Sequence, residues 1–209
     1  MLDNVEVFCH NSIKIKGSKT IYIDPFRINE EYKDADYVFS THSHYDHFSE
    51  DDIEKVMKEN TVIITPDSSR ELAYDLTKDK ERVKIIEPVK EYKLDGISFT
   101  TTHAYNREKM YHPKKEGWVG YIIELDGIKY YIAGDTDNVK ELKTVECDVA
   151  FIPVGGTYTM DYAEAAGLAN TIKAKVVVPT HYGLICGKKE DAEKFEKLVI
   201  DKDVQILIK

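Results

Sequence analysis

The segment at positions 41–49 constrains this chain more than any other, because it gathers three histidines and an aspartate within six positions. It runs Thr-His-Ser-His-Tyr-Asp-His-Phe-Ser, and the clustered side chains are His42, His44, Asp46 and His47. Neutral imidazole and carboxylate bind zinc and other divalent first-row metals, whereas Lys and Arg would repel them. Because positions 34–54 hold no Lys or Arg, the segment predicts a metal site that the fold must assemble.

The cysteines indicate which kind of metal site this is. Structural zinc sites usually complete their coordination with cysteine, but Cys9, Cys147 and Cys186 lie far from the histidine cluster and from one another. Their odd number and wide spacing also argue against disulfide bonds, so we expect reduced thiols in the core. An open, catalytic metal site is therefore favoured over a structural one.

Short runs of β-branched and aromatic residues alternate with amphipathic segments along the chain. The runs predict strands at 5–8, 20–23, 37–41, 62–65, 83–86, 97–102, 118–125, 129–133, 149–154, 176–180 and 204–208. Helices are predicted at 50–59, 68–78, 162–173 and 190–198. Asp126-Gly127 and Asp95-Gly96 indicate hairpins, which together with the βα units implies mixed sheets. Continuously apolar strands such as 149–152 need cover on both faces, so we expect an α+β chain of the α/β type, folded as a four-layer αββα sandwich.

Five polar residues each follow one of these strands directly. They are Asp24, His42, His103, Asp135 and His181. Loops at the carboxyl ends of strands are where α/β proteins place ligand chemistry. We therefore expect all five to converge on one rim of the sandwich, in a single site that includes the 41–49 cluster.

Composition narrows the class of protein and of partner. A chain of 209 residues with 42% hydrophobic residues, without linkers or repeats, is expected to form a single domain over residues 1–209. No apolar run reaches the roughly 18 residues that cross a bilayer, and residues 1–10 do not resemble a signal peptide, so a cytoplasmic protein is expected. The net charge of −9 disfavours nucleic acid and anionic membranes as partners, and it favours a small soluble substrate. The composition does not decide between a monomer and a homo-oligomer.

The cluster and the later polar residues together resemble a known family. The His-x-His-x-Asp-His run, followed by Gly134-Asp135-Thr136 and Thr180-His181 at strand ends, is similar to the motifs of the metallo-β-lactamase superfamily. This resemblance covers most of the chain and implies the same four-layer fold. The chain also looks like the ascorbate-6-phosphate lactonase-like group of metal-dependent hydrolases, through its compact length and the motifs Ile23-Asp24-Pro25, Gly155-Gly156-Thr157-Tyr158-Thr159-Met160 and Pro179-Thr180-His181-Tyr182-Gly183.

Carried onto this sequence, the resemblance implies two divalent metal ions per chain. Zinc is the favoured metal, and manganese or iron would also suit the set. The two ions would lower the pKa of a water between them towards about 7, so that a hydroxide attacks the substrate. Asp46, which would also orient this water, and Asp135 would then be catalytic. The implied ligands are His42, His44 and His103 for the first ion, Asp46, His47 and His181 for the second, and Asp135 as the bridge.

Asp24 has two interpretations. It lies where the superfamily has a buried aspartate near the ligand loop, and there it would accept a hydrogen bond from a ligand imidazole or a backbone amide. Alternatively, it is a turn residue before Pro25.

The polar segment at 104–117 predicts a loop over the site. Its basic residues, among them Lys109 and Lys114, would suit an anionic substrate, although solvated loop charges explain them equally well. His112 is the more specific candidate, since it could bind substrate or protonate a leaving group, with an ordinary loop histidine as the alternative. Lys114 and Tyr158 are further candidates for binding substrate, although the glycine-rich stretch that holds Tyr158 also fits a tight turn before a helix.

These features favour hydrolysis of an ester-like bond, a lactone or a phosphate ester, in a small anionic metabolite. One alternative is a phosphodiesterase or nuclease acting on nucleotides or RNA, whose relatives usually carry an added domain for which this chain leaves no room. Another is a non-hydrolytic metal-binding or redox protein, such as the flavodiiron proteins, which carry a flavin domain and a Glu ligand that are missing here. His10 and Cys186 have no partner in the sequence and are expected to be ordinary surface or core residues.

Overall fold

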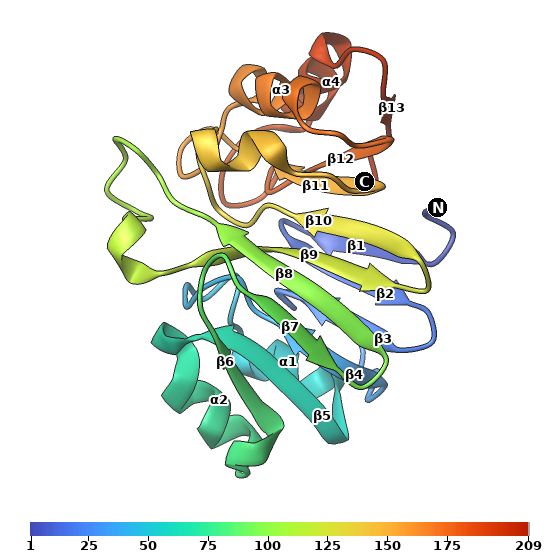
Figure 1. Ribbon diagram of the computed structural model, residues 1–209, viewed down its shortest axis with the longest axis vertical. Coiled ribbons are helices and arrows are strands. Elements are labelled where there is room, and N and C mark those ends of the chain that lie inside the picture. Colours follow the sequence, from blue (N-terminus) through green and yellow to red (C-terminus); the bar gives the residue numbers. More distant parts are fainter. Residues whose placement is uncertain (209) are drawn as a thin grey trace.

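The computed structural model describes residues 1–208 and stacks two β-sheets between two pairs of helices (Figure 1). The first sheet contains six strands, which neighbour one another in sequence order. The first three strands pair antiparallel, and the third to the sixth pair parallel. These strands are β1 (Val5–Cys9), β2 (Ser12–Lys16), β3 (Thr20–Ile23), β4 (Ala35–Phe39), β5 (Met57–Pro66) and β6 (Val83–Ile86).

The second sheet contains seven strands in the order β13-β12-β11-β10-β9-β8-β7. Their bounds are Glu91–Leu94 for β7, Ile97–His103 for β8, Val119–Leu125 for β9, Ile128–Ile132 for β10, Val149–Pro153 for β11, Val176–Thr180 for β12 and Asp203–Val204 for β13. Strands β10 to β13 are parallel, whereas β7 to β10 are antiparallel. Asp126-Gly127 joins β9 to β10 and Asp95-Gly96 joins β7 to β8, so both predicted hairpins are confirmed.

Helices cover the outer face of each sheet. On the first sheet, α1 (Glu50–Val56) and α2 (Arg70–Thr77) bury Ile53 and Ala73 against Val38. On the second, α3 (Tyr162–Thr171) and α4 (Lys189–Leu198) bury Leu168 and Phe195. In Figure 1 the two helix pairs lie at opposite ends of the molecule with both sheets between them, which confirms the αββα order. Short 3-10 turns complete the helical elements at η1 (Asp67–Ser69), η2 (Lys80–Arg82), η3 (Lys114–Glu116) and η4 (Lys140–Thr144).

The main core fills the space between the sheets and fixes their relative position. The ring of Phe39 in β4 meets Phe99 of β8 at 5.1 Å and Tyr121 of β9 at 5.0 Å, both edge to face. All three rings are buried, and burying a side chain of this size stabilises the fold by about 1.5–3 kcal/mol. Because β4 leads directly into the 41–49 cluster, this packing holds the cluster against the second sheet.

The structure differs from the sequence prediction at several elements. Strands β2 and β7 were not predicted, and β2 places Lys14 on a buried face, where its ammonium pairs with Asp34 at 2.8 Å. The helix predicted at 50–59 ends at Val56, because Met57 turns to an extended conformation with ψ of 135° and begins β5. The strand predicted at 204–208 is limited to Asp203–Val204 within the described residues.

No helix within residues 1–208 combines the length and the hydropathy that crossing a bilayer requires.

Candidate metal centre

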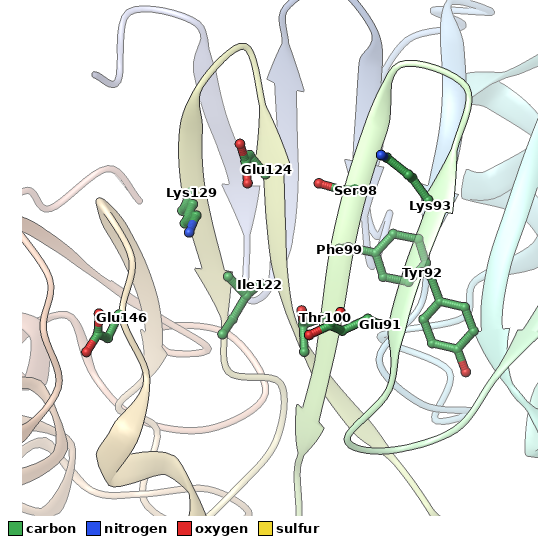
Figure 2. Close-up of a pocket in the computed structure, with 10 residues that line it drawn as sticks. All are labelled: Glu91, Tyr92, Lys93, Ser98, Phe99, Thr100, Ile122, Glu124, Lys129 and Glu146. Carbon is green, nitrogen blue, oxygen red and sulfur yellow. The ribbon is translucent and has the colours of Figure 1, made fainter.

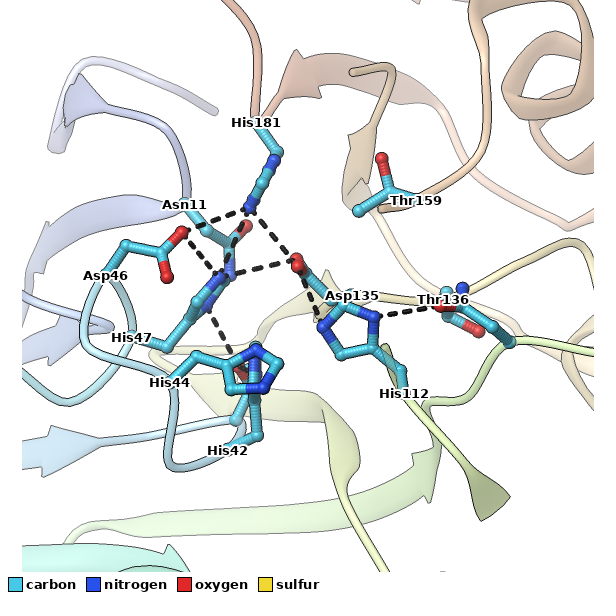
Figure 3. A network of polar contacts seen from close by, with 12 residues as sticks. Asn11, His42, His44, Asp46, His47, His112, Asp135, Thr136, Thr159 and His181 are labelled. Carbon is cyan, nitrogen blue, oxygen red and sulfur yellow. Dashed lines mark hydrogen bonds and ion pairs between the residues drawn. The ribbon is translucent and has the colours of Figure 1, made fainter. Parts of the chain in front are cut away.

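The candidate site lies where the carboxyl ends of parallel strands from both sheets meet (Figure 3). Asp24 follows β3, His42 lies in the loop after β4, Asp135 follows β10 and His181 follows β12. These four are buried, and they are four of the five residues that the sequence placed at one rim. The fifth, His103, lies elsewhere.

The first half-site consists of His42, His44 and His112. The Nε2 atom of His42 lies 3.0 Å from Nδ1 of His44, and the ring of His112 is 5.0 Å from both rings. The buried indole of Trp118 packs against all three, at 4.7 to 5.4 Å between ring centres. Burial, followed by the charge of His47, holds the pKa of His42 well below its usual value, so this imidazole is neutral and keeps a lone pair for a metal.

The second half-site consists of Asp46, His47 and His181. The Nε2 atoms of the two imidazoles lie 3.3 Å apart, and each is 3.4 Å from Oδ2 of Asp46. The rings of His47 and His181 stack, with an interplanar angle of 15°. All three side chains therefore direct ligand atoms to one point.

Asp135 lies between the two half-sites. Its carboxylate oxygens are 3.2 Å from His112, 3.2 Å from His181 and 3.4 Å from His47, so it contacts both groups. The residue before it, Gly134, has a φ of +67°, and an added Cβ would lie 2.9 Å from the carbonyl oxygen of Val119. Glycine thus allows the backbone to bring Asp135 into the space between the sheets.

The carboxylates and imidazoles shift one another's pKa values strongly. Burial alone would lower the pKa of His47 and of His181, but the nearby carboxylates, chiefly Asp135, raise both well above the usual value. Burial would also raise the pKa of Asp135, which the charges of His181 and His47 hold well below its usual value. Such a field of buried carboxylates would equally stabilise a bound cation.

Nδ1 has its own partner in four of the imidazoles, which leaves Nε2 as the nitrogen that faces the site; these are His42, His47, His112 and His181. His47 donates from Nδ1 to Asp24 at 2.7 Å, and the Thr41 hydroxyl donates to the same carboxylate while accepting from Nδ1 of His42 at 3.0 Å. In the same way, Nδ1 of His112 lies 2.9 Å from the side-chain oxygen of Asn106. Nδ1 of His181 lies 3.3 Å from the sulfur of Cys186. Partners of this kind leave Nε2 free to bind a metal, as they do in metalloenzymes generally.

The arrangement fits divalent metal ions. Three groups of side chains each bring ligand atoms within 4.8 Å of one another: His42, His44 and His112; His42, His47 and Asp135; and His10, Asp46 and His181. In addition, Nε2 of His112 and Oδ1 of Asp135 are buried and have no hydrogen-bond partner among residues 1–208. Buried polar atoms normally have partners, and a ligand set of neutral imidazoles and carboxylates suits zinc, manganese or iron.

His103, which the family resemblance implied as a ligand of the first ion, lies outside the first half-site, and His112 lies there instead. His103 ends β8, where it still pairs with Val119 of the sheet, and its ring lies 6.0 Å from that of Tyr105. Its pKa is lowered by partial burial and by the charge of Lys114, outside the metal-site cluster. The chain then folds back, because the Asn106 amide donates to the His112 carbonyl at 2.7 Å, and this closure carries His112 into the centre.

Lys114, expected to bind substrate, does not line the site. Its ammonium pairs with Glu141 at 2.8 Å and lies 4.7 Å from the centre of the Tyr105 ring. Lys109 likewise pairs with Asp137 at 2.7 Å. The acidic neighbours of these lysines hold them away from the metal centre, so the basic segment has a structural explanation.

His10 belongs to the site although the sequence offered no reason to expect it. It is fully buried, its Nε2 accepts a hydrogen bond from the Ile185 amide at 2.9 Å, and its ring lies 4.4 Å from His181. Burial and the charge of His181 lower its pKa to about 3, so the ring is neutral. Asn106 and Cys186 were also missed, because their roles depend on contacts that close only in the folded chain. The pairing of Asn106 and His112 within one short loop was the available signal.

A pocket of about 250 Å³ opens above the half-sites. It is lined by His44, Tyr45, Asp46, Tyr111, His112, Asp135, Tyr158, His181 and Ile185. Tyr158, a candidate from sequence for binding substrate, is one of these lining residues. A larger hollow on the second sheet (Figure 2) shares none of these residues and contains no histidine or cysteine; its lining runs along β7, β8 and β9 to Lys129 and Glu146.

Comparison with known proteins relates this geometry to a family. Residues 4–181 match the beta-lactamase superfamily domain. The chain is similar to a UPF0173 metal-dependent hydrolase from Thermococcus onnurineus, with 32% identity covering 96% of this chain and 93% of the relative. A second UPF0173 metal-dependent hydrolase, from Pyrococcus abyssi, is 31% identical over 98% of this chain and 96% of the relative.

Among solved structures, the chain is similar to a protein from Parabacteroides distasonis assigned to the metal-dependent hydrolases. The two share 28% identity and a TM-score of 0.80, over 98% of this chain and 93% of that chain. The likeness therefore extends over nearly the whole of both proteins.

Proposed function

Because the chain belongs to the beta-lactamase superfamily, we propose that it is a cytoplasmic metal-dependent hydrolase that binds two divalent ions. The observation that carries this proposal is the placement of Asp135 between two half-sites of buried imidazoles and a carboxylate. The relatives from Thermococcus and Pyrococcus are named as metal-dependent hydrolases, which supports the same class. Zinc is the favoured metal, with manganese and iron as alternatives.

The protein's own residues would hold the metals and move protons. His42, His44 and His112 would hold one ion, Asp46, His47 and His181 the other, and Asp135 would contact both. When bound, two divalent ions supply an acidified water molecule and polarise the bond to be cleaved. Asp46 lines the pocket and is placed to accept a proton from the attacking water. This gives His112 a ligand's role, in place of the three interpretations that the sequence left open: leaving-group acid, substrate contact or ordinary loop histidine.

The bond we propose is ester-like, as in a lactone or a phosphate ester. Hydrolysis consumes one water, whose oxygen bonds to carbon or phosphorus while the bond to the leaving oxygen breaks and that oxygen takes up a proton. A pocket of about 250 Å³ suits a small metabolite better than a polynucleotide. Because Lys109 and Lys114 are paired with acidic residues, an anionic group of the substrate would bind to the metal ions and not to these lysines.

Metal content and hydrolysis, measured on the same preparation, test this proposal. Protein purified without chelator should hold about two divalent ions per chain and should hydrolyse a lactone, phosphomonoester, phosphodiester or thioester when zinc or manganese is supplied. Asp135→Ala should lose both bound metal and activity. Asp126→Asn, in the exposed β9–β10 turn, is the matched control and should keep both.

Two results would contradict the proposal. Full activity after chelator treatment would exclude a role for metal in the reaction. A stoichiometry of one ion per chain with unchanged activity would exclude the two-metal arrangement. Turnover of RNA with no turnover of small esters would instead favour the nuclease alternative.

A further inference from the structure

The pocket above the candidate metal centre is built from two chemically different sets of side chains. Its floor carries the imidazoles and carboxylates of the half-sites and Asp135. Its wall consists of Tyr45, Tyr111, Tyr158 and Ile185, and no Lys or Arg is among the described residues that line it. The wall therefore offers flat apolar surface and phenol hydroxyls but no positive charge.

The three tyrosines come from separate segments and are held by aromatic contacts. Tyr111 of the 104–117 loop meets Tyr158 of the 155–160 turn edge to face, with ring centres 4.6 Å apart. Tyr45 of the 41–49 segment lies edge to face against Phe26 at 5.8 Å. Tyr45 and Tyr111 are nevertheless 64% and 51% exposed. Their positions are thus set by neighbouring rings, while much of each ring stays open to a ligand.

Exposed apolar side chains recur on the segments that contribute the pocket wall, where Met110 and Leu184 are the sequence neighbours of Tyr111 and Ile185. Nine large hydrophobic side chains are exposed among the described residues, and four of them lie on the segments that border the pocket: Tyr45, Met110, Tyr111 and Leu184. Clustered apolar exposure marks a binding site more often than scattered exposure does.

The basic side chains of the neighbouring loop are paired with residues that do not line the pocket. Arg107 contacts Glu164 at 3.3 Å, and Lys109 donates to both Asp137 and the Thr159 carbonyl. These contacts help to hold the loop in place. Recognition by the wall is therefore left to apolar contact and to the hydroxyl groups.

We propose that the substrate carries a flat aromatic group next to the bond that is cleaved, and that Tyr45, Tyr111 and Tyr158 hold this group. The inference rests on the proposed function, because it assigns a substrate class to the same site. A volume of about 250 Å³ admits one small ring system with its scissile linkage. Offset or edge-to-face contact with tyrosine rings favours such a group over an aliphatic chain of similar size.

A matched pair of lactones tests this substrate class. Isochroman-3-one and δ-valerolactone are both six-membered lactones that release a primary alcohol, and only the first has a fused benzene ring. With zinc-loaded protein, kcat/KM for isochroman-3-one should exceed that for δ-valerolactone by about tenfold, after correction for their rates of alkaline hydrolysis. The difference should arise mainly in KM.

Tyrosine variants identify the residues responsible. Tyr111→Ala and Tyr158→Ala should each reduce the preference for the aromatic lactone by about 2- to 10-fold, with metal content unchanged. Tyr111→Phe and Tyr158→Phe should retain most of it, because the ring remains. Tyr74→Ala, on the outer helix α2, is the control and should leave the preference unchanged.

The outcomes separate this inference from the proposed function. Equal kcat/KM for the two lactones, or alanine variants that affect both lactones alike, would overturn the aromatic subsite and leave the hydrolase standing. If neither lactone is hydrolysed, their dissociation constants from zinc-loaded protein, measured by ligand-observed NMR, decide the question. Tighter binding of isochroman-3-one that depends on Tyr111 and Tyr158 supports the subsite, and equal binding overturns it.

Discussion

The carboxylate of Asp24 lies 2.7 Å from Nδ1 of His47, and neither side chain is exposed to solvent. The same carboxylate accepts hydrogen bonds from the Thr41 amide at 2.8 Å and from the Asn11 side chain at 2.7 Å. Asp24 therefore orients a ring of the second half-site and anchors the start of the ligand loop. The expected hydrogen bond to an imidazole and to a backbone amide is present, and the alternative of a simple turn residue does not account for these contacts.

Replacing Asp24 should weaken metal binding without removing a ligand. Asp24→Asn keeps the shape of the side chain but removes the charge that favours the Nδ1–H form of His47, so we expect metal affinity to fall by about 10- to 100-fold. Competition with a chromophoric chelator would measure this change. Asp36→Asn, a comparable aspartate at the opposite end of the first sheet, should leave metal affinity as it is. Equal effects of the two variants would contradict the assigned role.

His112 and His103 provide a paired test of the first half-site. His112→Ala should lower bound metal and reduce hydrolysis by at least about 100-fold, because it removes a ligand whose Nε2 is buried beside Asp135. His103→Ala should leave both quantities nearly unchanged, since its ring contacts Tyr105 instead. Metal analysis and initial rates on the same samples would decide between them. The reverse result would restore the ligand set expected from sequence.

The exchange of these two histidines shows what strand patterns can and cannot predict. The expectation that polar residues directly after strands converge on one rim holds for His42, Asp135 and His181. It fails for His103 because β8 extends one residue farther and keeps that side chain at the sheet. The position of His112 depends on a loop closed by Asn106, a contact between residues in irregular structure that no periodicity records.

The fold itself was largely predictable, because local patterns specify it. The hairpin turns, the four helices and the βα units appear in the sequence, and together they require two sheets with helices outside, the metallo-β-lactamase fold that the comparisons also support. The missed strand β2 alternates isoleucine with lysine. Its Lys14 is buried because the ammonium forms an ion pair with Asp34 and a cation–π contact with the Tyr32 ring. Such pairing is a tertiary property.

Removal of the His10 ring should destabilise the fold around the second half-site. His10→Ala would leave the part-buried Ile185 amide without its acceptor, and we expect a loss of about 1 kcal/mol, the lower end of the range for a buried group. His10→Gln, which can place an acceptor near the position of Nε2, should recover part of this loss. Urea denaturation of the two variants and the parent protein would measure the free energy of unfolding. An alanine variant as stable as the parent protein would show that the amide finds another partner.

Asp52 in α1 holds the segment that follows β3. Its carboxylate accepts hydrogen bonds from the Arg27 amide at 2.8 Å, the Ile28 amide at 3.0 Å, the Ser49 hydroxyl at 2.9 Å and the Lys55 ammonium at 2.8 Å. Burial alone would raise the pKa of Asp52, but these hydrogen bonds lower it below its usual value.

Acid should therefore remove a contribution that Asp52 makes at neutral pH. Because the folded-state pKa is lowered, this contribution is fully present above the unfolded-state pKa of about 3.9 and is lost as pH falls through the folded value. We expect Asp52→Asn to lower the free energy of unfolding by about 1–3 kcal/mol at pH 7. The difference in free energy of unfolding between the variant and the parent protein should shrink as pH falls. Urea denaturation across this range measures both curves, with Asp67→Asn as an exposed control. A constant gap at every pH would show that ionisation of Asp52 contributes nothing, since only a difference in proton uptake between the folded and unfolded chains can make the curves converge.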